Sequence, residues 1–210
     1  MKANTIESVH ITTHSGKLEG MHSISTAVKL NPNCRDRRNI KGSICQKCYA
    51  ETLTDYRDGL EAWLEYNTAQ LTTDMINPLP IINDKYFRLE AFGDLINETQ
   101  VHNYFRICYA NKGTRFALWT KNPWIIASAL KTASKPDNLI IVYSSPMINK
   151  AVNVKALKKL YPFVDKVFTV YRKAYANEHN VTINCGGNHC LSCLRCYSKR
   201  TADTVNELLK

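Results

Sequence analysis

The sequence predicts an α/β protein in which parallel strands alternate with helices. Stretches rich in β-branched and aromatic residues, some with period-2 alternation, are separated by stretches whose apolar residues recur at helical spacing. No linker interrupts this series, and alternation of this kind is typical of βα units that share one sheet. A chain of 210 residues also fits one medium-sized domain. We therefore predict a single domain over residues 1–210.

Turn-forming residues bound the predicted elements. The strands are expected at residues 24–32, 85–93, 115–120, 138–145, 166–172 and 181–184. The helices are expected at residues 46–75, 98–113, 123–134, 152–161 and 202–209. Pro32 is predicted to end the first strand, and Asn97 to cap the second helix. Asn122 followed by Pro123 has the pattern of a cap and first helical residue.

Candidate binding residues follow the predicted strands. In parallel α/β folds, ligands bind beyond the carboxyl ends of the strands. The residues at these positions are Glu90, Gly93 and Asp94 at or directly after the end of the second strand, Lys121 after the third and Ser144 at the end of the fourth. Each has a structural alternative: an internal Glu–Arg pair for Glu90, ordinary turns for Gly93-Asp94 and Ser144, and a solvated cation for Lys121.

The chain contains 8 cysteines and no apolar run long enough for a signal peptide or a membrane span. We therefore expect a cytoplasmic protein with reduced thiols, in which clustered cysteines indicate metal binding more than disulfides. Cys108 stands alone on a predicted helix and is interpreted as a small buried hydrophobe. The other cysteines form two groups, one near each end of the chain.

The group near the C-terminus consists of Cys185, Cys190, Cys193 and Cys196. Its C-x2-C-x2-C spacing is the one with which ferredoxin-type loops bind three corners of a [4Fe–4S] cluster, and Cys185 supplies a fourth thiolate. A four-thiolate zinc site and a set of metal-free thiols are the alternatives.

The group near the N-terminus consists of Cys34, Cys45 and Cys48. Three thiolates leave one iron of a [4Fe–4S] cluster open for a ligand, as an open position does at a catalytic zinc. The alternative is a structural site completed by His22, Asp36 or Cys108. Both groups are expected at one rim of the sheet, because each is adjacent to the end of a predicted strand.

The net charge of +10 favours an anionic partner such as nucleic acid. The alternative is that the charge only keeps the protein soluble. An alternative function is therefore a basic nucleic-acid-binding protein that is braced by zinc or by a cluster and has no catalytic activity. No phosphate-binding P-loop and no G-x-G-x-x-G motif is present, so nucleotide hydrolysis and a Rossmann cofactor site are unsupported.

Two family resemblances add to these expectations. A strand followed by the three-cysteine loop ending in "CQKCYA" resembles the cluster loop of radical S-adenosylmethionine enzymes, although C-x10-C-x2-C is longer than that superfamily's C-x3-C-x2-C. The resemblance implies a partial (β/α)6 TIM-like barrel with cysteine loops at its C-terminal rim, and an electron donor as partner. It also implies that S-adenosylmethionine binds the open iron, with Glu90 or Asp94 near its amine and Tyr49 as the nearby aromatic residue.

The second resemblance covers nearly the whole chain. The motifs "ICQKCYA", "RLEAFGDL", "ALWTKNP", "YSSP" and "CGGNHCLSCLRCY" together are similar to the phage and prophage "gene product eighty-eight" family. This resemblance implies a protein of phage or mobile-element origin that acts in the cytoplasm of the host cell. It implies no particular reaction.

Overall fold

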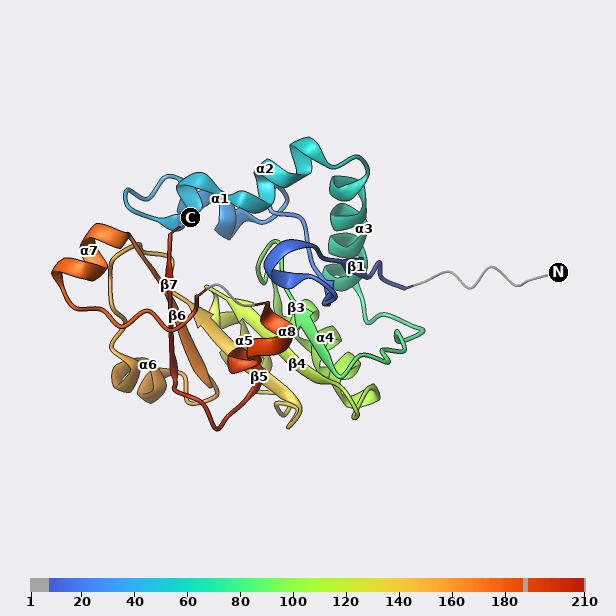
Figure 1. Cartoon of the computed structure of the whole chain (residues 1–210). Helices are drawn as coiled ribbons and strands as arrows, with labels where there is room; N and C mark the ends of the chain where they lie inside the picture. Colours follow the sequence, from blue (N-terminus) through green and yellow to red (C-terminus); the bar gives the residue numbers. More distant parts are fainter. Residues whose placement is uncertain (1–7, 187–188, 210) are drawn as a thin grey trace.

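The structure is a computed structural model that describes residues 8–186 and 189–209. Its centre is a seven-stranded sheet in which the strands follow one another in chain order (Figure 1). The strands are β1 (Thr12–Thr13), β2 (His22–Ile24), β3 (Tyr86–Leu89), β4 (Arg115–Thr120), β5 (Leu139–Ser144), β6 (Lys166–Tyr171) and β7 (Thr204–Leu208). Strand β1 is antiparallel to β2, and every other neighbouring pair is parallel. The chain thus has an α/β fold with a mostly parallel sheet.

Helices connect the parallel strands. The α-helices are α1 (Pro32–Arg38), α2 (Tyr49–Tyr56), α3 (Leu60–Thr73), α4 (Glu98–Ala110), α5 (Pro123–Ala129), α6 (Val154–Leu160), α7 (Lys173–Glu178) and α8 (Cys190–Cys193). Short 3-10 helices are η1 (Gly16–Leu18), η2 (Ile44–Lys47) and η3 (Arg195–Tyr197). None of the helices in the described part of the chain has the length and apolar composition that crossing a membrane requires.

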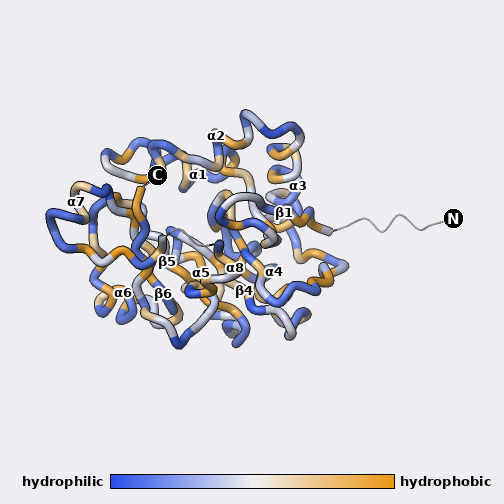
Figure 2. Tube along the Cα trace, viewed as in Figure 1, coloured by the Kyte–Doolittle hydropathy of each residue, from blue (hydrophilic) through white to orange (hydrophobic). Residues whose placement is uncertain are grey.

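The two faces of the sheet are covered by different parts of the chain. On one face, Phe87, Phe116 and Leu139 are in register and pack with Phe105 of α4 and Ile126 of α5 in the main core. The turn between α2 and α3 and the segment after α7 lie outside this apolar core, and Figure 2 shows both as hydrophilic. Burial of the large apolar side chains of this core provides the main driving force for folding.

On the opposite face, Arg88, Ala117 and Ile140 are in register. We call this the cysteine face, because the C-terminal cysteine segment covers it. Ala117 and Ile140 form a second cluster with Tyr197 of η3, against which Cys190 and Cys196 also pack. Figure 1 shows α8 in front of β4 and β5.

Several predicted elements are confirmed. Strand β4 has its predicted bounds, and β3, β5 and β6 lie within their predicted ranges. The side chain of Asn97 caps α4 by accepting a hydrogen bond from the backbone N–H of Gln100. Cys108 is fully buried in the main core, as predicted. These segments agree with the sequence because their local patterns and their places in the sheet favour the same structure.

Two predictions in the N-terminal half were wrong. Strand β2 ends at Ile24, and Pro32 begins α1 instead of ending a strand, because the side chain of Asn31 caps the helix and Pro32 occupies its first turn. The helix predicted over residues 46–75 is divided into η2, α2 and α3. Gly59, with a φ of +74°, separates α2 from α3 in a left-handed conformation that glycine adopts without steric cost.

The C-terminal prediction was also wrong. Residues 181–184 are not a strand, and residues 202–209, predicted to be a helix, contain β7. A helix was predicted because residues such as Glu207 and Leu208 favour helices locally. In the structure this segment pairs with β6, and the pairing buries Val205. Tertiary pairing therefore outweighed local propensity. Helix α7 was not predicted.

Candidate functional site

The N-terminal cysteine group lies on a loop at the carboxyl ends of the parallel strands. Cys34 is in α1, Cys45 is in η2, and Cys48 follows η2 directly. The Ser43 side chain accepts a hydrogen bond from the backbone N–H of Cys45, which fixes the start of η2. The loop is also tied to the segment after β5, where the backbone N–H of Ile44 donates to the carbonyl of Pro146 at 2.8 Å.

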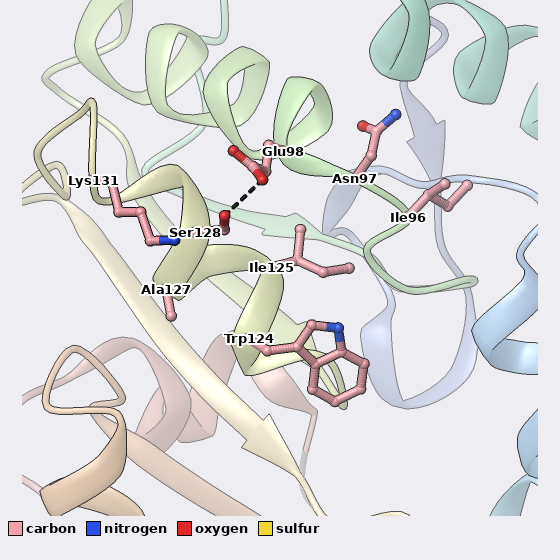
Figure 3. A pocket seen from close by; sticks show the side chains of 8 residues that line it. All are labelled: Ile96, Asn97, Glu98, Trp124, Ile125, Ala127, Ser128 and Lys131. Atoms are coloured by element: carbon pink, nitrogen blue, oxygen red, sulfur yellow. Dashed lines mark hydrogen bonds between the residues drawn. The ribbon is translucent and has the colours of Figure 1, made fainter.

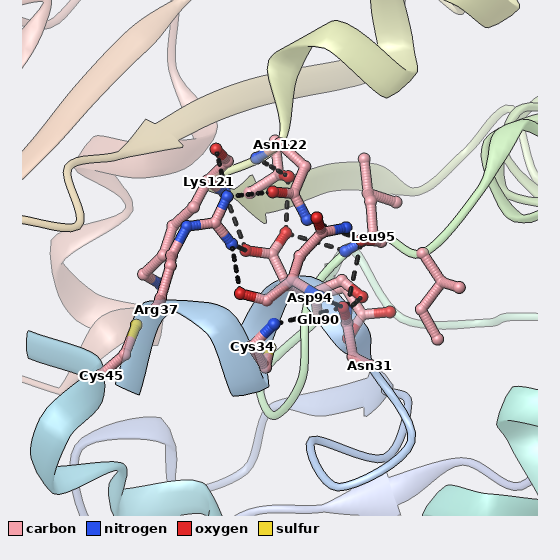
Figure 4. A network of polar contacts seen from close by, with 12 residues as sticks. Asn31, Cys34, Arg37, Cys45, Glu90, Asp94, Leu95, Lys121 and Asn122 are labelled. Atoms are coloured by element: carbon pink, nitrogen blue, oxygen red, sulfur yellow. Dashed lines mark hydrogen bonds and ion pairs between the residues drawn. The ribbon is translucent and has the colours of Figure 1, made fainter. Parts of the chain in front are cut away.

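A polar network attaches this loop to the strand ends (Figure 4). Arg37 of α1 donates to the side chain of Asn122 and to the carbonyl oxygen of Lys121, both just after β4. Asp94 accepts hydrogen bonds from the Thr120 hydroxyl at 2.6 Å and from the backbone N–H of Lys121 at 2.9 Å. The loop that carries Cys34 is therefore positioned by contacts with the ends of β3 and β4.

The three thiols influence one another. Burial raises the pKa of the Cys34 thiol, and the charges of Asp94, Cys45 and Cys48 raise it further, while Lys121 opposes them. Burial lowers the pKa of Lys121, but the negative groups Asp94, Cys45 and Cys34 outweigh burial and raise it overall. Lys121 is thus a cation close to the N-terminal group.

Tyr49 begins α2 directly after Cys48. Its hydroxyl donates to the carbonyl oxygen of Ala91, which follows β3, and its pKa is raised by burial of that hydroxyl. The residue as a whole is 59% exposed, so the tip is enclosed while much of the ring remains accessible. Tyr49 therefore joins the cysteine loop to the end of β3 and still presents an aromatic surface.

The C-terminal cysteine group lies along the cysteine face. Cys185 forms a parallel bridge with Glu207 near the carboxyl end of β7. Cys190 and Cys193 are in α8, and Cys196 is in η3. Burial raises the pKa of Cys196 to about 12, the charges of the other three thiols raise it too, and Arg88 opposes them. The four thiols therefore form a second mutually interacting group.

All eight cysteines lie in the described residues and all are free thiols. Within residues 8–186 and 189–209, no three His, Cys, Asp or Glu side chains come together around a position that fits a single metal ion. The donor chemistry of both groups suits a thiolate-bound metal or cluster, since Cys thiolates are ligands of zinc and of iron–sulfur clusters. That either group binds a metal or a cluster, and which one, stays a prediction.

Glu90 is buried at the end of β3, with 2% of its surface exposed. Its carboxylate accepts hydrogen bonds from the Thr26 backbone and hydroxyl, the Gln100 amide and the Tyr104 hydroxyl. Burial nevertheless raises its pKa to about 8. The carboxyl group is thus engaged by four donors within the protein, and it connects β2 and α4 to the end of β3.

Gly93 occupies the tightest position of this region. Its φ is +59°, and a Cβ atom there would lie 2.4 Å from the carbonyl oxygen of Thr26 and 2.9 Å from Oε2 of Glu90. The sequence singled out this glycine as a binding residue or a turn. The structure shows a close backbone approach that excludes any side chain.

We expect Gly93→Ala to lower the free energy of unfolding by at least about 3 kcal/mol, since left-handed strain adds to a clash with backbone. Gly59→Ala is the matched control, because Gly59 also has a positive φ but no atom lies within 4 Å of the position that a Cβ would take there. Gly59→Ala should lower the free energy of unfolding by only about 1 kcal/mol. Urea denaturation of both variants measures the difference, and equal losses would contradict this interpretation of Gly93.

Ser144, the remaining predicted binding residue, ends β5 and pairs with Phe168 of β6. It is buried and lies at the same carboxyl rim as Lys121. The structure thus brings Tyr49, Glu90, Asp94 and Lys121 to the end of β3 and β4 beside the N-terminal cysteines. Whether they bind a cofactor stays a prediction.

A pocket lies elsewhere, between the start of α4 and α5 on the outer side of the molecule (Figure 3). It is lined by Ile96, Asn97, Glu98, Trp124, Ile125, Ala127, Ser128 and Lys131. The Ser128 hydroxyl donates to Glu98 across it at 2.6 Å. No cysteine lines this pocket, but it borders the polar network, because the guanidinium carbon of Arg37 lies 5.5 Å from the ring centroid of Trp124.

Several residues of the site were missed by sequence reasoning. Arg37 joins the N-terminal loop to the strand ends, and Lys17 donates a hydrogen bond to Cys185. Arg88, the arginine of the Glu–Arg pair that the sequence suggests for Glu90, lies on the cysteine face in register with Ala117, against whose cluster Cys190 and Cys196 pack. The alternation of β3 could have predicted the position of Arg88, because Phe87 faces the main core and the next residue must face the other side of the sheet. No local sequence pattern predicts the position of Lys17.

The fold and site together define a class: a mostly parallel α/β protein with two thiol groups, one at the carboxyl ends of the strands and one along a face of the sheet. The chain belongs to the Gene product 88 family, whose model matches residues 4–207. Comparison with curated proteins and with solved structures gave no match.

Proposed function

We propose that this protein is an iron–sulfur protein of the radical S-adenosylmethionine type, with a [4Fe–4S] cluster at each cysteine group. The observation that carries the proposal is the gathering of Cys34, Cys45 and Cys48 beside Lys121 at the carboxyl ends of parallel strands. This rim is where α/β proteins bind cofactors and substrates.

The strand order supports a partial barrel. Strands β2 to β7 are neighbours in chain order, as in a (β/α) barrel, whereas a doubly wound sheet reverses its order at a switch point. We therefore propose that the sheet is a partial (β/α)6 barrel with the cysteine face inside. Phage or mobile-element origin is part of the same proposal and rests on the family.

At the N-terminal site, Cys34, Cys45 and Cys48 would hold the cluster and leave one iron open. The cluster, when bound, would supply low-potential one-electron transfer. Lys121 provides a positive charge for a cofactor carboxylate, and Tyr49 provides an accessible ring. Arg37 and Asp94 hold the loop against the strand ends, so they keep the thiols in place for ligation.

The acidic residues have a different role in this proposal from the one that the resemblance implies. Both oxygens of Glu90 accept hydrogen bonds within the protein, and both oxygens of Asp94 do the same. A cofactor amine would have to compete with these donors. We propose that Glu90 and Asp94 mainly brace the site, and that the open iron and Lys121 provide the principal cofactor contacts.

Anaerobic purification tests the proposal. We expect a brown protein with broad absorption near about 400 nm that bleaches with dithionite, together with stoichiometric iron and sulfide. A colourless protein with stoichiometric zinc would contradict it. If clusters are present, release of 5′-deoxyadenosine from S-adenosylmethionine under reducing conditions would identify an enzyme, and its absence would identify a cluster protein without that activity.

A further inference from the structure

Lys17 connects the two ends of the chain at the C-terminal cysteine group. Its Nζ donates a hydrogen bond to Sγ of Cys185 at 3.1 Å and a second one to the carboxylate of Glu207. Because Cys185 bridges Glu207 through the backbone, the ammonium group closes a compact arrangement of three side chains. The Lys17 side chain is 24% exposed and forms an ion pair with the carboxylate of Glu207, which favours the charged ammonium form.

The loop that carries Lys17 is itself held against the C-terminal cysteine segment. Nδ1 of His189 lies 3.1 Å from the carbonyl oxygen of Gly16, at hydrogen-bonding distance. A Cβ atom on Gly20 would lie 3.2 Å from the side chain of Leu191 in α8. These contacts position Lys17 from both sides, so its bond to Cys185 belongs to a packed arrangement.

Arg88 is a second cation at the same group. It lies on the cysteine face with its guanidinium carbon 3.9 Å from the ring centroid of Trp119. Its Nε atom is buried and has no hydrogen-bond partner among the described residues. Arg88 is in register with Ala117, and Cys190 and Cys196 pack against the cluster that contains Ala117, so the guanidinium lies on the same face of the sheet as these thiols.

Lys17 and Arg88 are half-buried, and a cation that is partly removed from water is stabilised by nearby anions. Metal-bound cysteines are thiolates, and a centre with four thiolates is anionic for zinc and for a [4Fe–4S] cluster alike. We propose that Lys17 and Arg88 are the counter-cations of an anionic four-thiolate centre on Cys185, Cys190, Cys193 and Cys196, and that Lys17 sets its reduction potential. This inference rests on the proposed function.

Lys17 acts through Cys185, so it is a positioning residue. Reduction adds one negative charge to the cluster, and a hydrogen bond with a positive charge on a ligand sulfur stabilises the reduced form more than the oxidised form. Lys17 therefore raises the reduction potential. Glu207 partly offsets this charge, but it also holds the ammonium group at the sulfur.

The test compares Lys17→Met with the native chain, both loaded with clusters, by potentiometric titration followed by electron paramagnetic resonance. We expect the ratio of reduced to oxidised C-terminal cluster to fall about tenfold at a given potential. The reason is that loss of one hydrogen bond to a charged group changes an equilibrium constant by about tenfold. That change equals about 59 mV for a one-electron couple. The N-terminal cluster, which Lys17 does not contact, serves as the internal reference.

Two further variants are controls. Lys17→Arg keeps the charge and a donor, so its potential should lie near the native value. Lys29→Met removes a lysine that is also paired with carboxylates, those of Glu61 and Asp55, but is exposed and remote from the C-terminal thiols. It should change neither potential.

If analysis finds zinc at this site, the rate of zinc transfer to a chromogenic chelator replaces the potential, and Lys17→Met should raise it about tenfold. A loaded C-terminal centre that is insensitive to Lys17→Met would overturn this inference and leave the proposed function standing. A native chain that binds no metal at the C-terminal cysteines would overturn both.

Discussion

Replacing Cys45 and Cys48 together with serine should remove about four irons from the purified protein and leave about four at the C-terminal group. The reason is that Cys34 alone cannot retain a cluster, while the C-terminal thiols are carried by other segments: α8, η3 and the bridge of Cys185 with Glu207. The converse variant, with Cys190 and Cys193 replaced, should keep only the N-terminal cluster. Iron and sulfide analysis of anaerobic preparations measures both.

Cys108→Ala is the matched control for these variants. It also removes a thiol, but Cys108 is buried among Val101, Phe105 and their neighbours in the main core. Its iron content should equal that of the native chain, although its stability should fall. If both double variants lost all iron, the two groups would share one centre, and the assignment of separate sites would be wrong.

The stability of the native protein should fall as pH rises from about 5 to about 8, through the titration of Glu90. Its pKa in the folded protein is about 8, above the ordinary value of 4.5, because the carboxyl is buried. Between these values the folded state binds a proton that the unfolded state has released. The resulting stability is therefore fully present below pH 4.5 and is lost by about pH 8.

Glu90→Gln removes this titration while keeping the size of the side chain. At pH 5 the variant should be about 1–3 kcal/mol less stable than the native chain, because its amide cannot accept from every donor around it. The difference should shrink toward pH 8, since only the native protein loses stability. Urea denaturation at a series of pH values measures this, with Glu65→Gln on the exposed side of α3 as control. Parallel pH profiles for native and Glu90→Gln would exclude Glu90 as the titrating group.

The central strands were predictable because local pattern and tertiary environment agree there. Residues 115–120 combine β-branched or aromatic residues with turn signals on both sides, and Phe116 and Leu118 face the core as the alternation requires. The last strand was not predictable in this way. Its residues favour a helix locally, and only the free edge of β6 makes them a strand.

The candidate site was predictable to the extent that its residues follow strands in the sequence. Lys121 and Asp94 were found because parallel strands bring their carboxyl ends to one rim. The contact between Lys17 and Cys185 joins residues separated by 168 positions. No periodicity or motif marks such a pair, so only the three-dimensional structure identifies it.

Because every parallel strand lies beside the one made just before it, the sheet can grow in the order of translation. Domains generally fold from the N-terminus during synthesis. The loop with Cys34, Cys45 and Cys48 leaves the ribosome early, together with the first strands that support it. The C-terminal thiols and β7 emerge later than that loop, so the two cysteine groups would reach their folded surroundings at different times.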